Sequence, residues 1–107
     1  MKKLLVMLLL FISMHSVYGE ILNTEGTIST VRYHTVLHNT TDARQLTSFS
    51  MNIPFNTGCS WVYLVAGDKE ALSTVLAAKM SNATVKIYYD SQQLYRGLCA
   101  VTAIDIL

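Results

Sequence analysis

The sequence lacks a basic excess, a recognisable nucleophile motif and any apolar run long enough to cross a membrane. Only 14% of its 107 residues are charged, and the formal net charge is +1. Such a chain has no broad cationic surface to neutralise phosphates, so nucleic-acid binding is disfavoured. There is no G-x-S-x-G elbow, and the serines, histidines and acids form no recognisable catalytic set. We therefore expect a protein that is not an enzyme and that has no cofactor.

The longest apolar run is too short for a membrane span but has the length of an export signal. A start with two lysines precedes Leu4–Ile12, a run of nine apolar residues, whereas a transmembrane helix needs about 20. Short side chains then lie before the bond that follows Gly19, as in a signal-peptidase site. We expect residues 1–19 to be a cleaved signal peptide. Residues 20–107 are then one small domain, secreted or periplasmic, with no membrane insertion.

Cleavage would also remove the formal positive charge. Without the two lysines of the signal, six basic residues remain against seven acidic ones. The mature surface is therefore slightly acidic.

Cysteine is scarce, and its scarcity is informative. Cys59 and Cys99 are the only two in the chain, and an even pair in an exported protein predicts a disulfide. The bridge would close a loop of about 40 residues, which the chain-entropy estimate values at roughly 4 kcal/mol. There is no C-x-x-C pair, and His34 and His38 lack zinc-site spacing relative to either cysteine. We expect a structural disulfide and no metal.

Most of the mature chain shows short strand patterns, with one helical pattern among them. We predict strands at Thr27–His38, Gln45–Ile53, Cys59–Ala66, Thr84–Tyr89 and Leu98–Leu107. The first of these changes phase partway along, which indicates a β-bulge or a strong bend. Residues 20–26 read as an N-terminal loop.

The helical pattern falls between the third and fourth predicted strands. Asp68 can cap its start, and the apolar residues at helical spacing are Leu72, Val75, Leu76 and Met80. The element order predicts a mainly β protein, a five-stranded OB-fold-like barrel with one helix between strands 3 and 4. The alternative is an open sheet with one helix packed on it.

The aromatic residues are the most informative candidates for a binding surface. The mature chain contains Tyr33, Trp61, Tyr63, Tyr88, Tyr89 and Tyr95. Rings with a hydroxyl suit contacts with sugars or proteins, although Trp61, Tyr63 and some of the others are equally well explained as core. Strand phase and turn position indicate that Tyr88 and Tyr95 are exposed.

One segment resembles a known family. The run Val85–Asp90 directly follows the predicted helix and is similar to a strand of subtilase cytotoxin B subunits. Gly58-Cys59-Ser60 and Gly26-Thr27-Ile28-Ser29 fall in matching order. The resemblance extends to the subtilase-like and pertussis-like B subunits of AB5 toxins. It implies an exported OB fold that assembles as a pentameric ring and binds cell-surface glycans.

The resemblance also implies site residues. Tyr89 matches a sugar-contacting tyrosine of the family, and Tyr88 lies beside it. Glu25 stands where the family has a serine, and a carboxylate there would repel the carboxylate of a sialic acid. The glycan-binding set that the resemblance implies is Tyr89, Glu25 and Tyr88.

The expected function is that of an exported, non-enzymatic binding protein that recognises a host-surface glycan or protein as a homo-oligomer. The resemblance also implies a toxic A subunit as a partner. Two other readings fit the small size, the signal and the single predicted disulfide. One is a periplasmic inhibitor or immunity protein that binds a secreted enzyme. The other is a small subunit of an envelope complex.

Overall fold

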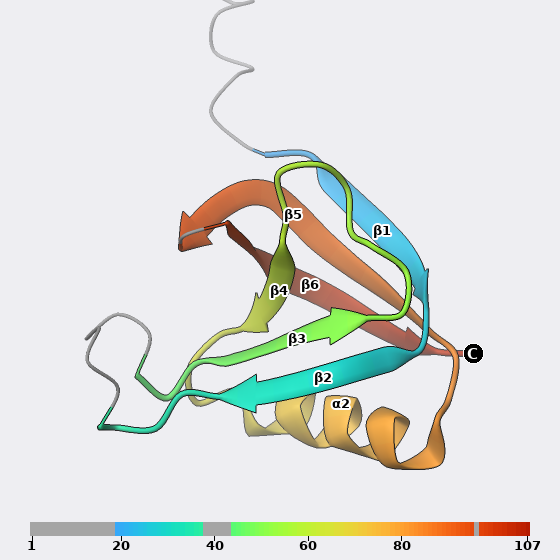
Figure 1. Cartoon of the computed structure of the whole chain (residues 1–107), viewed down its shortest axis with the longest axis horizontal. Coiled ribbons are helices and arrows are strands. Elements are labelled where there is room, and N and C mark those ends of the chain that lie inside the picture. Colours follow the sequence, from blue (N-terminus) through green and yellow to red (C-terminus); the bar gives the residue numbers. More distant parts are fainter. Residues whose placement is uncertain (1–18, 38–43, 96) are drawn as a thin grey trace, which may run out of the picture.

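The computed structural model describes residues 19–37, 44–95 and 97–107, and this part of the chain is mainly β with one helix (Figure 1). The strands are β1 (Ile21–Gly26), β2 (Ile28–Tyr33), β3 (Thr47–Met51), β4 (Trp61–Leu64), β5 (Val85–Tyr95) and β6 (Leu98–Ile106). Helix α2 (Lys69–Ser81) lies between β4 and β5. Apart from Gly19, the expected signal peptide lies outside the described residues.

The strands form one mixed sheet in the order β1-β5-β6-β4-β3-β2. β4 and β6 pair in parallel, and the other four pairings are antiparallel. The expectation of five strands is wrong, because the described chain has six. The expected closed barrel is not seen either, since the pairings between described residues leave β1 and β2 as the two edges of the sheet.

The extra strand arises at a corner centred on Thr27. Residues 21–26 pair with β5 rather than forming the expected loop, and β2 pairs with β3. The side chain of Asn52 accepts a hydrogen bond from the Thr27 N–H at 2.8 Å, and the Asn52 N–H donates to the Thr27 carbonyl at 2.9 Å. Gly26 lacks the Cβ that would collide with Asn52 here. The predicted bulge is confirmed as a register shift between Ile28 and Thr30.

Alternating side chains of β2, β3, β4, β5 and β6 fill the core, Leu22 of β1 packs against it, and α2 covers it at one end. Its largest fully buried members are Phe49, Val62, Val75, Val85, Ile87 and Tyr89. The predicted disulfide is confirmed: Cys59 and Cys99 are joined with their Cα atoms 5.5 Å apart. It ties Cys59, two residues before β4, to Cys99 near the start of β6, and these two strands pair side by side.

The helix begins as predicted, and Leu72 and Val75 of its predicted face pack in or against the core, but the rest of that face is exposed. The Asp68 carboxylate accepts a hydrogen bond from the Ala71 N–H at 3.1 Å, which caps the helix. Val75 and Ala78 are buried, whereas Leu76 is 42% exposed and Met80 is 87% exposed. The sequence pattern gave too much weight to large apolar residues, because the small Ala78 makes the close contact with the sheet.

Candidate functional site

Tyr89, the leading glycan-binding candidate, lies in the core with none of its surface exposed. Its hydroxyl lies 2.9 Å from the Thr24 hydroxyl and accepts from the Asn56 N–H at 2.9 Å. The same hydroxyl donates to the Asn56 side-chain oxygen. Phe55 packs edge-on against the ring, with centroids 5.2 Å apart. One O–H and two lone pairs are thus fully used, so Tyr89 fastens the β3–β4 loop to the sheet and cannot stack on a sugar.

Glu25 and Tyr88 lie together on the opposite, outer face of the sheet. Glu25 is opposite Lys86 in the β1–β5 register, and Lys86 is opposite Asp105 on β6. Tyr88 is only partly buried, and the Lys86 ammonium lies 5.4 Å from its ring centroid. The side chain of Tyr95, also expected to be exposed, lies outside the described residues. The structure therefore separates Tyr89 from the other two members of the predicted set.

A second part of the outer face is aromatic. The Arg32 guanidinium lies 4.7 Å from the ring centroid of half-buried Trp61. Tyr63, two residues further along β4, is only 6% exposed. Its burial raises the pKa of the Tyr63 hydroxyl, and the charge of Asp90 adds to the effect. In this part of the face the aromatic ring of Trp61 is already in contact with Arg32, and Tyr63 is buried.

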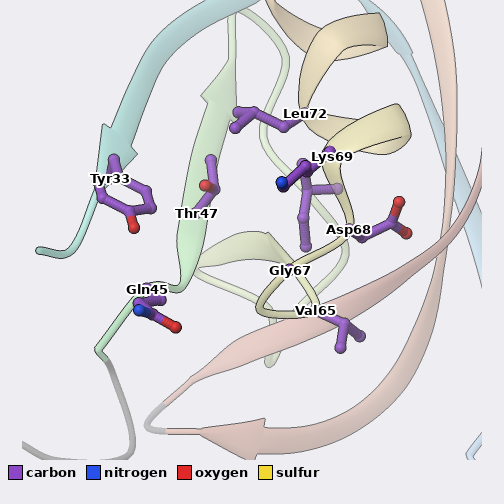
Figure 2. Close-up of a pocket in the computed structure, with 9 residues that line it drawn as sticks. Tyr33, Gln45, Thr47, Val65, Gly67, Asp68, Lys69 and Leu72 are labelled. Atoms are coloured by element: carbon purple, nitrogen blue, oxygen red, sulfur yellow. The ribbon is translucent and has the colours of Figure 1, made fainter. Parts of the chain in front are cut away.

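A concave surface lies elsewhere, between the ends of β2 and β3 and the start of α2. We call it the Tyr33 hollow. It has a volume of about 390 Å³, and its lining residues are Tyr33, Gln45, Thr47, Leu64, Val65, Gly67, Asp68, Lys69 and Leu72. Figure 2 shows these side chains around the space between the strands and the helix.

Strand register explains the wall of the Tyr33 hollow. Tyr33, Thr47 and Leu64 stand directly opposite one another on β2, β3 and β4. They follow the buried row that contains Phe49 and Val62, so they share its inward face. Thr47 and Leu64 are covered, but Tyr33 is the last residue of β2 and remains 52% exposed. The wall therefore ends in an accessible aromatic ring.

An unusual backbone conformation places Gln45 at the mouth of the Tyr33 hollow. Its φ is +63°, in the left-handed region that is uncommon for residues other than glycine. The Gln45 N–H donates to the His34 carbonyl at 2.6 Å, and the His34 N–H donates to the Leu46 carbonyl at 2.9 Å. These bonds hold the strained residue in place. Strain of this kind is concentrated at functional positions.

The first turn of α2 supplies the opposite wall. Figure 2 shows Leu72 and Lys69 directed toward the strands, whereas the Asp68 carboxylate is directed away from them. Leu72 packs against the core, and the Lys69 ammonium lies at the rim. The hollow thus combines an apolar floor, one exposed ring, and hydroxyl, amide and ammonium groups around it. That combination is typical of ligand pockets.

Sequence reasoning missed the Tyr33 hollow because its parts come from four elements, β2, β3, β4 and α2, and from the connections between them. Tyr33 was counted among the tyrosines but given no role, while Gln45 and Lys69 carried no signal of their own. The usable clue was the position of Tyr33 at the end of an inward-facing run. An aromatic residue on that face, one step beyond the buried rows, can form the rim of a cavity.

Other kinds of site have less support in the described residues. Among residues 19–37, 44–95 and 97–107, no three potential metal ligands of the His, Cys, Asp and Glu types lie together. In the same part of the chain, no helix is long and apolar enough to cross a membrane. Comparisons with protein-family models, curated proteins and solved structures find no match to this chain. A functional assignment therefore depends on the geometry of the hollow.

Proposed function

We propose that the chain is an exported, non-enzymatic binding protein, similar to a B subunit of AB5 toxins, that recognises a cell-surface glycan in the Tyr33 hollow. The observation that carries the proposal is the half-exposed Tyr33 ring at the mouth of an apolar pocket, with Gln45, Thr47 and Lys69 around it. A sugar presents one C–H face for an aromatic ring and several hydroxyls for polar side chains. This site differs from the Tyr89 position that the resemblance implies.

The proposal includes an OB-like barrel as the scaffold. β1 and β2 are separated by Thr27 alone, and they pair with β5 and β3 respectively. If β1 and β2 are counted as two halves of one bent strand, the order β1-β5-β6-β4-β3-β2 begins and ends with the same strand. That is the arrangement of a five-stranded closed barrel. The disulfide supports export, since such bonds persist in oxidising compartments.

Glycan-array binding with two matched variants tests the assignment of the site. Tyr33→Ala removes the exposed ring of the hollow, and Tyr88→Ala removes a ring of equal size from the outer face. We expect Tyr33→Ala to weaken binding about tenfold, which corresponds to about 1.4 kcal/mol, and Tyr88→Ala to leave it unchanged. An array on which no glycan is bound would overturn the proposal. If only Tyr88→Ala lost binding, the glycan site would instead lie on the outer face of the sheet.

Light scattering tests the assembly that the proposal expects. A B-subunit-like protein should form a ring of several copies, with five as the family value implied by the resemblance, while the toxic A subunit would be a separate chain. A monomer at all concentrations would exclude the ring. The array result would then decide alone whether the chain is a glycan-binding protein.

A further inference from the structure

The second half of β6 has a strand partner on one side only. The parallel pairing with β4 covers Leu98, Cys99 and Ala100 and goes no further. β4 ends at Leu64, and the chain then turns away through Gly67, whose φ is +85°, into α2. Among the described residues, positions 101–106 therefore pair with β5 but with nothing on their other side.

This edge offers a row of backbone groups to a further strand. In an antiparallel pair, alternate residues direct their N–H and C=O groups away from the partner strand. Alternate residues of 101–106 consequently present these groups on the side that β4 has left. Unpaired edges of this kind are templates for the addition of another strand. A register shift opposite Tyr88 and Tyr89 marks where the free stretch begins.

A groove runs beside this free edge, between β6 and the first turns of α2. We call it the β6 groove. Its volume is about 300 Å³, and its lining residues are Leu64, Val65, Asp68, Glu70, Ala71, Thr74, Val101, Thr102, Ala103 and Ile104. Two of the helix residues in this lining, Ala71 and Thr74, have short side chains. Their small size leaves space that a larger residue would fill.

The charges of the β6 groove have one sign. Its lining contains two carboxylates, Asp68 and Glu70, and no lysine or arginine. Glu70 is exposed. Asp68 caps the helix through one of its carboxylate oxygens. Because both carboxylates lie at the start of α2, a ligand with a cation at that position is favoured over a neutral or acidic one.

We propose that the β6 groove binds an extended peptide segment of another protein, which pairs with residues 101–106 and places a lysine or arginine beside Asp68 and Glu70. Strand addition derives affinity from main-chain hydrogen bonds and specificity from the pockets that take alternate side chains. This function is independent of the glycan pocket, which lies on the other side of the Val65–Asp68 turn.

A second copy of the chain fits the groove less well than a foreign peptide. β1, one exposed edge of the sheet, carries Glu25 and no basic residue. β2, the other edge, carries Arg32, but that guanidinium is already placed over Trp61. Neither edge strand therefore offers a free cation to Asp68 and Glu70.

The test is selection from a displayed library of random peptides of about ten residues, long enough to span the free edge. Enriched peptides should alternate apolar and polar residues and carry a lysine or arginine. The best one should bind Glu70→Lys about tenfold more weakly. Glu20→Lys is the matched control, because it makes the same charge change at an exposed residue away from the groove, and it should bind normally.

Amide hydrogen exchange then locates the peptide. Binding should slow exchange within 101–106, and a peptide with prolines at alternate positions should lose this effect because proline has no N–H. The proposal is overturned if no peptide is enriched, if Glu70→Lys binds as well as the unchanged protein, or if protection lies elsewhere. If residues 101–106 were protected in the absence of peptide, and this protection increased with protein concentration, the occupant would instead be a second copy of the chain.

Discussion

The two ends of the described molecule differ in what their polar groups do. At one end, the loop formed by residues 52–60 is tied to the sheet by the Tyr89 hydroxyl and by the Cys59–Cys99 bridge. At the other end, α2 begins beside two hollows that share Leu64, Val65 and Asp68. Figure 1 shows the loop and the helix on opposite sides of the sheet. Side chains at the loop end bind one another, while those at the helix end remain accessible to a ligand.

This difference shows why a tyrosine in a binding-site pattern can still be structural. The buried hydroxyl of Tyr89 makes all its hydrogen bonds within the chain and has none left for a ligand. The half-exposed ring of Tyr33 still has a surface that a ligand can contact. We therefore expect changes at the loop end to alter stability, and changes at the helix end to alter binding.

Removal of the disulfide should have the largest effect. Cys59→Ser combined with Cys99→Ser releases a loop closed across a sequence separation of 40 residues, and we expect a loss of about 4 kcal/mol in the free energy of unfolding. Urea denaturation of the double variant measures this loss. The unchanged protein in reductant is the control, and it should show a similar loss. A loss below about 1 kcal/mol would mean that the loop end does not depend on the bridge.

Tyr89→Phe should be next in size. It removes only the hydroxyl and leaves polar groups of Thr24 and Asn56 without their partner, so we expect a loss of about 2 kcal/mol. Tyr88→Phe is the matched control, with an expected change within about 0.5 kcal/mol. Both variants are compared by urea denaturation and on the glycan array. If Tyr89→Phe lost glycan binding at unchanged stability, the division between the two ends would be wrong.

The two adjacent tyrosines also show what strand phase can and cannot predict. Alternation correctly places Tyr88 and Tyr89 on opposite faces and indicates that Tyr88 is the accessible one. The assignment of Tyr89 to a sugar contact came from the resemblance, and strand phase cannot reveal the partners of its hydroxyl. Those partners lie on β1 and in the β3–β4 loop, 65 and 33 residues away in sequence.

Features fixed by local chemistry were predicted well. The helix cap at Asp68, the bulge near Ile28 and the disulfide are all confirmed. β1 was missed because it is an edge strand with little apolar content, and Gly26 looked like a break rather than one side of a corner. Beyond the clue from Tyr33, the hollow could not be predicted, because it requires the left-handed backbone of Gln45 and the placement of the start of α2 opposite β2 and β3.

A smaller effect is expected at the helix end from Asp68→Ala. The change removes the cap of α2, whose carboxylate accepts from the Ala71 N–H, and should cost about 1 kcal/mol. Because Asp68 lines both hollows, we also expect weaker binding of both ligands. Ser73→Ala is the matched control, since it alters an exposed helix position outside both hollows and should change stability by less than about 0.5 kcal/mol. Unchanged binding by Asp68→Ala would show that the hollows do not need an ordered helix start.

The smallest effect concerns Tyr63, which lies on the sheet between the two ends. Burial raises the pKa of its hydroxyl above the ordinary 10.0, and the negative charge of Asp90 raises it further. The folded protein therefore holds this proton more tightly than the unfolded chain does, so the contribution to stability is complete below pH 10 and is lost as pH rises through the folded pKa. Stability should fall above pH 10, and Tyr63→Phe should reduce the fall.

Ultraviolet titration of phenolate formation, compared between the unchanged protein and Tyr63→Phe, identifies the hydroxyl that ionises last. If the comparison showed that the Tyr63 hydroxyl ionises at or below its ordinary pKa, the surroundings of Tyr63 on β4 would be as open to solvent as the helix end.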